Sequence, residues 1–137
     1  MSKTLYLIRG LPGSGKTTLA MAMVEAGMGC AYAADDFFTD DDGVYRYIPS
    51  SISAAHNWCQ RQVMEDMLDG EGVIIVHNTF SRLWEMEWYV NEAAMQEYNV
   101  CLITVEGDYP GGKWTGKEGL RQQLRTRMSE RWETYSN

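Results

Sequence analysis

Residues 10–17 read Gly10-Leu11-Pro12-Gly13-Ser14-Gly15-Lys16-Thr17 and match the pattern G-x-x-x-x-G-K-[ST] without a gap. The apolar run before it, residues 5–8, is typical of a buried strand, and residues 18–26 after it are typical of a helix. A loop in this position can wrap its backbone N–H groups around phosphate oxygens at the helix N-terminus. The sequence therefore predicts a phosphate-binding loop that extends from Gly10 to Thr18.

Two side chains of this loop have roles that the motif itself implies. Lys16 would reach the β- and γ-phosphates, and the Thr17 hydroxyl would hold Mg²⁺. The alternative is a glycine-rich turn between a strand and a helix that binds no ligand. Because the lysine, the hydroxyl, both glycines and the flanking elements are all in register, we expect a nucleoside triphosphate to bind here.

Length and composition limit what the rest of the chain can be. At 137 residues we expect a single domain over residues 1–137. The longest aliphatic run, residues 73–76, is far shorter than the roughly 20 residues of a membrane span, and Arg9 interrupts the first apolar stretch. Cys30 and Cys101 begin strand-like segments, where a free thiol usually acts as a small apolar residue, and no C-x-x-C spacing suggests zinc or a disulfide. The expectation is a soluble, cytoplasmic protein with no membrane partner.

Charge is distributed unevenly along the chain. The formal net charge is −7, which leaves nucleic acid possible as a partner but does not favour it. From residue 113 onward there are six basic and three acidic residues, so this tail carries +3 and the rest −10. The sequence thus predicts a basic C-terminal helix on an acidic body.

Strand and helix patterns alternate along the chain without repeats or linkers. We expect strands at 4–9, 29–33, 73–76 and 100–105, and helices at 15–25, 51–68, 81–98 and 119–135. The strands are apolar runs rather than alternations, as in a parallel sheet that is covered on both faces. The predicted fold is α/β, a three-layer α/β/α sandwich with a parallel sheet of four or five strands and right-handed crossovers.

Polar residues follow each predicted strand, and ligands of such folds bind beyond the carboxyl ends of the strands. These residues are Gly10, the pair Asp35-Asp36, His77 with Asn78 and Thr79, and Glu106. Asp35 or Asp36 could accept the proton of an attacking hydroxyl or help to hold Mg²⁺. The alternative is that both are turn acids, with Asp36 capping the next segment. We favour Asp35 for the functional role.

The long loop after Asp36 is acidic and aromatic. Residues 40–43 read Asp-Asp-Asp-Gly and are interpreted as a solvated turn, because a calcium loop in that register would place Phe38 and Pro49 at ligand positions. Its aromatic residues could line a substrate pocket or belong to the core, and the sequence does not distinguish the two. They are Phe37, Phe38, Tyr45 and Tyr47.

His77 is the unexpected residue of the predicted site. Many phosphate-loop enzymes place an aspartate at the end of this strand to anchor Mg²⁺ through water. A neutral imidazole is a poor magnesium ligand, because that cation prefers oxygen. Either Asp35 holds the metal together with Thr17, or hydrolysis is weak.

The last predicted helix brings several arginines to one part of the molecule. Arg121 and Arg125 are the residues that we expect to contact phosphate, although acidic side chains of the body are an alternative anion. Residues 107–112 form a glycine-rich hinge before the helix. The sequence thus predicts a lid at about residues 107–127 that closes over the nucleotide.

Several segments together resemble one family of small kinases. They are residues 9–18, Ala34-Asp35-Asp36-Phe37-Phe38, Ala55-His56-Asn57-Trp58, Asn78-Thr79-Phe80 and Trp84-Glu85-Met86. In these segments the chain resembles the P-loop kinases related to the 5′-hydroxyl kinase domain of polynucleotide kinase, which include small stand-alone AAA-type ATP-binding proteins of phages and eukaryotes. The resemblance implies ATP with Mg²⁺, a general base at Asp35, phosphate binding by Lys16 and Thr17, and a lid arginine on the last helix.

The chain departs from this family in three places. Phe38 stands where polynucleotide kinase has an arginine, and His77 stands where an aspartate is common. The lid region between Glu106 and Leu120 is shorter and rich in glycine. The leading hypothesis is an ATP-dependent kinase that transfers the γ-phosphate to a hydroxyl acceptor, which could be a polynucleotide 5′-hydroxyl, a nucleoside or a small molecule. The alternatives are an ATPase or GTPase with water as acceptor, and a nucleotide-binding interaction module without turnover.

Overall fold

Four parallel strands form the central sheet, in the order β2-β3-β1-β4. The strands are β1 (Thr4–Gly10), β2 (Cys30–Tyr32), β3 (Val73–Asn78) and β4 (Asn99–Val105). The computed structural model describes residues 2–107 and 118–134, and for residues 118–121 the backbone alone. The predicted parallel sheet is confirmed, with four strands.

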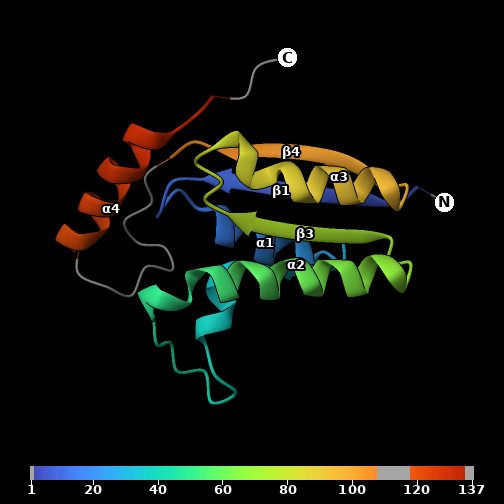
Figure 1. Ribbon diagram of the computed structural model, residues 1–137, viewed down its shortest axis with the longest axis horizontal. Helices are drawn as coiled ribbons and strands as arrows, with labels where there is room; N and C mark the ends of the chain where they lie inside the picture. The colour runs from blue at the N-terminus through green and yellow to red at the C-terminus, as the bar shows by residue number, and fades with distance from the viewer. Residues whose placement is uncertain (1, 108–117, 135–137) are drawn as a thin grey trace.

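Helices cover both faces of this sheet, which makes the predicted three layers (Figure 1). Helix α1 (Lys16–Glu25) packs on one face, and α2 (Ile52–Leu68) and α3 (Glu87–Met95) pack on the other. Three short 3₁₀ helices, η1 (Ala34–Phe38), η2 (Pro49–Ser51) and η3 (Leu83–Met86), lie in the connections. Helix α4 (Glu118–Arg131) lies beyond the carboxyl ends of the strands rather than against a face of the sheet.

Successive residues of β1 point to opposite faces and explain its continuous apolar run. Leu5 and Leu7 belong to the core beneath α2 and α3, whereas Ile8 belongs to the core beneath α1. All three are buried. Because both faces of the central strands are covered, apolar side chains are favoured at every position, and the strand shows no polar alternation.

Two local expectations differ from the structure. The helix expected at 81–98 is shorter, because the chain first forms η3 and α3 extends only from Glu87 to Met95, ahead of the left-handed φ of 62° at Glu97. Cys30 and Cys101 are exposed rather than apolar core residues, because they lie on the two edge strands, β2 and β4. No helix within the described residues is long and apolar enough to cross a membrane.

The turn into β2 depends on the absence of a side chain at Gly29. Its φ is +136°, and a Cβ at this position would collide with the carbonyl oxygen of Val73. Gly29→Ala should therefore lower the free energy of unfolding by about 2 kcal/mol or more. Gly72→Ala is the matched control, since nothing lies within 4 Å of its added Cβ, and it should change stability by less than about 0.5 kcal/mol. Equal denaturation midpoints for the two variants would contradict this account of the turn.

Candidate functional site

The phosphate-loop motif begins where β1 ends, and its shape depends on glycine. The N–H of Gly10 donates to the carbonyl of Thr79 at 3.3 Å, which ties the start of the loop to the segment after β3. A Cβ on Gly10 would collide with the Ser14 hydroxyl, so the loop folds back closely on its own first residue. Gly15 has a φ of 102° and precedes the first residue of α1, so it turns the chain into the helix. The loop thus has the strand-to-helix geometry that the motif predicts.

The polar groups of the loop fit an anion. Among the described residues, the buried hydroxyl of Ser14 has no hydrogen-bond partner. A buried polar atom without a partner is unfavourable, and a phosphate oxygen would satisfy it. Lys16 lies at the first turn of α1, where the helix dipole also favours negative charge. The loop therefore carries donors and positive charge with the chemistry that a triphosphate requires.

Lys16 is surrounded by the other predicted site residues. Burial lowers the pKa of Lys16 to about 8, while the charge of Asp35 raises it and that of Arg125 lowers it. These electrostatic interactions require both side chains to lie near the ammonium group. The structure thus brings Lys16, Asp35 and Arg125 together, from three segments far apart in the sequence.

Thr17 and His77 form a second pair at the base of the loop. Thr17 Oγ1 lies 3.3 Å from His77 Nδ1, so the ring is a neighbour of the hydroxyl that the motif assigns to Mg²⁺. Burial, with a further contribution from Lys16, lowers the pKa of His77 to about 4, so the ring is neutral at pH 7. Among the described residues no cluster of three or more His, Cys, Asp and Glu side chains could hold a metal ion. Oxygen ligands from the phosphates and water would have to complete a magnesium site.

The two adjacent aspartates have different environments. Asp36 Oδ2 accepts a hydrogen bond from the N–H of Ala33 at 3.1 Å and caps η1, which is the structural role considered for it from the sequence. Asp35 is exposed, and its Oδ1 accepts a hydrogen bond from the Tyr45 hydroxyl at 2.6 Å. Of the pair, Asp35 is therefore the carboxylate that is free of a helix-capping role.

Asn78 fixes the segment that carries Asp35. Its Oδ1 accepts a hydrogen bond from the N–H of Ala34 at 2.8 Å, and its Nδ2 lies 3.9 Å from the sulfur of Cys59. This buried amide joins the end of β3 to the start of η1 and so sets the position of the next residue, Asp35. Sequence reasoning placed Asn78 at a strand end but assigned it no contact. The feature of the sequence that could have indicated this role is the position of Asn78 directly after an apolar strand.

The acidic loop folds as a flap beside Asp35. Thr39 and Tyr45 form an antiparallel bridge, and Asp40 Oδ1 accepts from the N–H groups of Asp42 and Val44, each at 2.9 Å. Phe38 is buried and makes edge-to-face contacts with neighbouring rings, whereas the other rings stay exposed. The exposed aromatic residues are Phe37, Tyr45 and Tyr47. The sequence left open whether these aromatic residues belong to the core or line a pocket. Phe38 belongs to the core, and the other three remain accessible.

Of the two arginines predicted to contact phosphate, Arg125 has a described side chain, and it lies at the loop. Its Nη1 donates to the carbonyl of Pro12 at 2.6 Å, and its Nη2 donates to the carbonyl of Gly107 at 2.9 Å. A cavity of about 290 Å³ lies beside it, between α4, Leu11 and the end of β4. The side chain of Arg121 lies outside the described residues, as does the part of the predicted lid at 108–117.

The fold and the loop together define the class of this protein, a nucleotide-binding protein with the fold of the P-loop kinases. The chain belongs to the AAA domain family, whose sequence profile matches residues 5–110. This confirms the resemblance to P-loop kinases related to polynucleotide kinase.

Similar proteins include one curated relative and several solved structures. Human NEDD4-binding protein 2 is 36% identical over 139 residues, which cover 96% of this chain and only 8% of that protein. A chain of the Pnkp1/Rnl/Hen1 RNA repair complex matches with a TM-score of 0.65 and 19% identity, over 95% of this chain and 45% of that one. A mutant of APS kinase CysC of Mycobacterium tuberculosis matches with a TM-score of 0.53 and 14% identity, over 94% and 98% of the two chains. At these identities the two structures show the fold alone.

The lowered pKa of Lys16 predicts a pH dependence of nucleotide binding. Bound phosphate favours the ammonium form, so binding above a pKa of about 8 requires Lys16 to take up a proton. The affinity for ATP should therefore fall as pH rises above about 8, by up to about tenfold per pH unit. Calorimetry in two buffers of different ionisation enthalpy measures both the affinity and the proton uptake.

The control for this prediction is Lys16→Arg, whose guanidinium stays charged across the same range. The affinity of this variant for ATP should be lower overall and nearly constant between about pH 7.5 and 9.5. This range extends from about half a unit below to about 1.5 units above the pKa of Lys16. The same decline in both proteins would assign the effect to another group.

Proposed function

We propose that this protein is an ATP-dependent kinase that transfers the γ-phosphate of ATP to a hydroxyl acceptor, with Asp35 as the general base. The observation that carries the proposal is the hydrogen bond of 2.6 Å from the Tyr45 hydroxyl to Asp35 Oδ1. A carboxylate that accepts a short hydrogen bond from a hydroxyl beside the phosphate loop has the relation to that hydroxyl that a general base requires. In the proposed complex an acceptor hydroxyl takes the place of the Tyr45 hydroxyl.

The transfer conserves atoms and charge in a simple way. The acceptor oxygen forms a bond to the γ-phosphorus, the bond from that phosphorus to the β,γ-bridging oxygen breaks, and ADP leaves. The acceptor proton passes to Asp35. Lys16 and Arg125 stabilise the charge on the transferred group, and Arg125 exchanges its carbonyl partners at Pro12 and Gly107 for phosphate oxygens.

Magnesium fits this site through oxygen ligands. When bound, Mg²⁺ neutralises phosphate charge. Thr17 would hold it through its hydroxyl, phosphates and water would supply the other oxygen ligands, and Asp35 would remain available to take the acceptor proton. His77 is buried and neutral at pH 7, so its role is to contact the Thr17 hydroxyl rather than to bind the metal.

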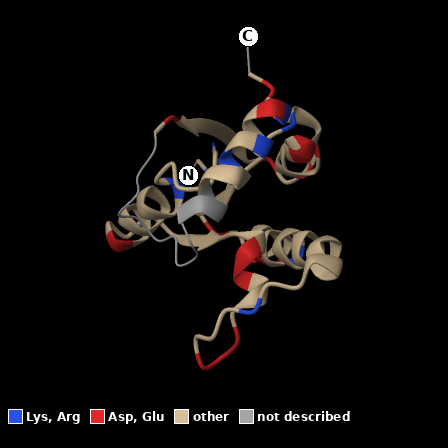
Figure 2. Cartoon of the chain, turned by 90° about the vertical axis from the view of Figure 1, so that its left-hand side faces the viewer, with Lys and Arg blue, Asp and Glu red and all other residues tan. Residues whose placement is uncertain are grey.

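The charge around Asp35 bears on the class of acceptor. The flap beside it carries the three consecutive acids of residues 40–42, and Figure 2 shows acidic residues on this loop, well separated from the basic residues of α4. A polyanionic acceptor would be repelled there, whereas a neutral acceptor with a planar ring could stack on the exposed rings of Phe37 and Tyr47. A nucleoside or a small aromatic alcohol is therefore favoured over a long nucleic acid strand.

Asp35→Asn tests the catalytic assignment. The variant should lower kcat for phosphate transfer by a factor of about 10² to 10⁴, because an amide cannot accept the proton. Its affinity for Mg²⁺–ATP should stay within about twofold, since a general base contributes little to ground-state binding. Asp41→Asn, at an exposed acid of the same flap, is the control for the loss of one charge. Wild-type transfer rates for Asp35→Asn would remove Asp35 from the mechanism, and a large loss of Mg²⁺–ATP affinity would make it a metal ligand instead.

The acceptor class can be read from a labelling experiment. The protein is incubated with γ-labelled ATP and 5′-hydroxyl DNA or RNA, nucleosides, or small alcohols, and the labelled products are separated. Label on a nucleoside or small alcohol supports the proposal, and label on strands alone contradicts the argument from charge. Release of inorganic phosphate alone under every acceptor would identify a hydrolase with water as its acceptor.

A further inference from the structure

Arg9 is a fully buried cation near the end of strand β1, directly before the phosphate loop, and its exposed fraction is 0%. Its Nε and Nη2 donate to the carbonyl of Phe80 at 3.1 and 2.7 Å, and Nη2 also donates to the carbonyl of Glu133 at 2.7 Å. Its guanidinium lies 3.9 Å from the centre of the Trp132 ring. Burial lowers the pKa of Arg9, and the charges of Glu133 and Glu85 raise it. A buried guanidinium of this kind holds its acceptors in place, because losing one would leave donors unsatisfied.

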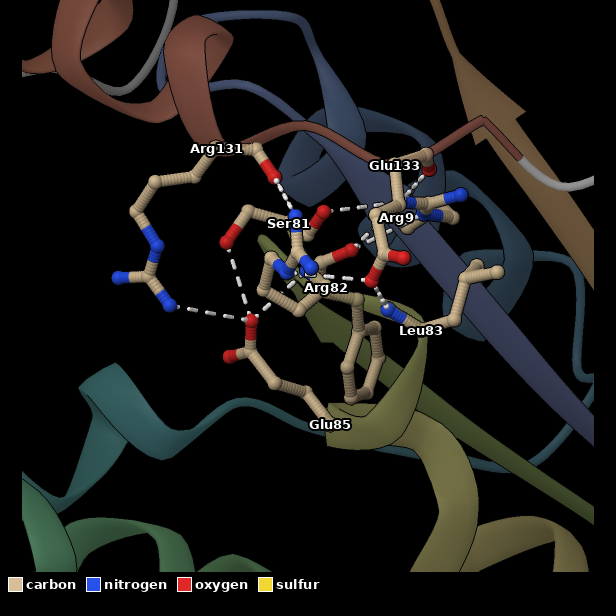
Figure 3. A network of polar contacts seen from close by, with 8 residues as sticks. Arg9, Ser81, Arg82, Leu83, Glu85, Arg131 and Glu133 are labelled. Atoms are coloured by element: carbon tan, nitrogen blue, oxygen red, sulfur yellow. Dashed lines mark hydrogen bonds and ion pairs between the residues drawn. The ribbon is translucent and has the colours of Figure 1, made fainter.

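Glu133 is attached to the segment after β3 by both its backbone and its side chain. Its N–H donates to the carbonyl of Ser81 at 2.7 Å. Its Oε1 accepts from the N–H of Leu83 at 2.9 Å and lies 3.1 Å from Nε of Arg82. With the contact to Arg9, four separate interactions fix this one residue, and Figure 3 shows their partners, which belong to β1 and to the segment after β3.

The adjoining contacts extend the same network to the last turn of α4. Arg82 Nη1 donates to the carbonyl of Arg131 at 3.1 Å, and Arg131 Nη2 lies 3.8 Å from Oε1 of Glu85. Phe80 has a φ of 47°, which is unfavourable for a bulky residue, and its carbonyl is the one that receives two donors from Arg9. A strained backbone that persists indicates that the surrounding contacts determine it.

The helix face that carries Arg125 is set by this attachment. Arg125 and Ser129 lie four residues apart on one face of α4. Trp132 directly follows the helix, and its N–H donates to the carbonyl of Ser129 at 3.2 Å, so it stays close to that face. All three line the cavity beside Leu11. Arg125 lies about 9 Å along the helix from Arg131, the last residue of α4, at 1.5 Å per residue. Rotation or translation of the helix at Trp132 would therefore move the Arg125 guanidinium away from the phosphate loop.

We propose that Arg9, Trp132 and Glu133 form a clamp that holds helix α4 by its C-terminal end and so positions Arg125 over the phosphate loop. They are positioning residues that act through Arg125 and do not touch the nucleotide. This inference rests on the proposed function, because Arg125 is the residue that contacts phosphate there. The clamp joins the strand before the loop to the helix above it, so the two sides of the phosphate site are held by one guanidinium.

A double-mutant cycle tests the clamp. Trp132→Leu and Glu133→Ala should each weaken ATP binding by a factor of about five to ten in the wild-type background, and by less than about twofold in Arg125→Ala. Glu130→Ala is the matched control, since it removes the same side chain from an exposed position on α4 and should leave the affinity unchanged. Calorimetry gives the dissociation constants, and thermal unfolding shows that each variant is folded. An equal loss of affinity in both backgrounds, or no loss in either, would overturn the proposal.

A second measurement needs no nucleotide. Amide hydrogen exchange within residues 122–131 should be faster in Trp132→Leu and Glu133→Ala than in wild type, and unchanged in Glu130→Ala. Unchanged exchange in all three variants would overturn the clamp. If wild type fails to bind ATP while these exchange rates rise, the clamp stands and the proposed function fails. If wild type binds ATP and Arg125→Ala binds it equally well, Arg125 is not its target and the clamp has no role at the site.

Discussion

Strand β1 is hydrogen-bonded on both sides, to β3 and to β4, and the rest of the site depends on this central position. Because both neighbours fix the strand, the place where it ends is fixed as well, and the phosphate loop starts there. The same register brings His77 level with Ile8 and Asn78 level with Arg9, so the end of β3 supplies the contacts beneath the loop. The pairing of the strands alone thus brings the phosphate loop and the end of β3 together.

Arg9 places a buried charge in the central strand β1. A charge buried at the end of a central strand is unfavourable unless all its surroundings are acceptors. The acceptors here are mainly carbonyl oxygens, of Phe80 and Glu133, with the Trp132 ring alongside. The charges of Glu133 and Glu85 act on this guanidinium as well and compensate part of its positive charge. Arg9 therefore acts on the loop mainly by fixing the chain segments beneath it.

The sequence predicted those parts of the molecule that depend on neighbours in the chain. The phosphate loop and the four strands follow from local patterns, and Asp35 follows from its place after a strand. The contacts of Arg9 could not be predicted, because Glu133 lies 124 residues away and its backbone carbonyl accepts the bond. The left-handed φ of Phe80 could not be predicted either, since a bulky residue rarely adopts it and its carbonyl accepts from the distant Arg9. The bond from Tyr45 to Asp35 depends on how the flap folds, which composition alone does not determine.

His77 changes the charge at the end of β3, where an aspartate is common in phosphate-loop enzymes. The ring faces the Thr17 hydroxyl and is neutral at pH 7, so it adds no negative charge where other phosphate-loop enzymes place an aspartate. A carboxylate at that position would stand close to Lys16 and would compete with phosphate for its charge. With histidine there, the ammonium of Lys16 has Asp35 as its attractive neighbour. In the proposed mechanism the negative charge that acts on Lys16 thus comes from Asp35, the carboxylate that would take the acceptor proton, and not from the end of β3.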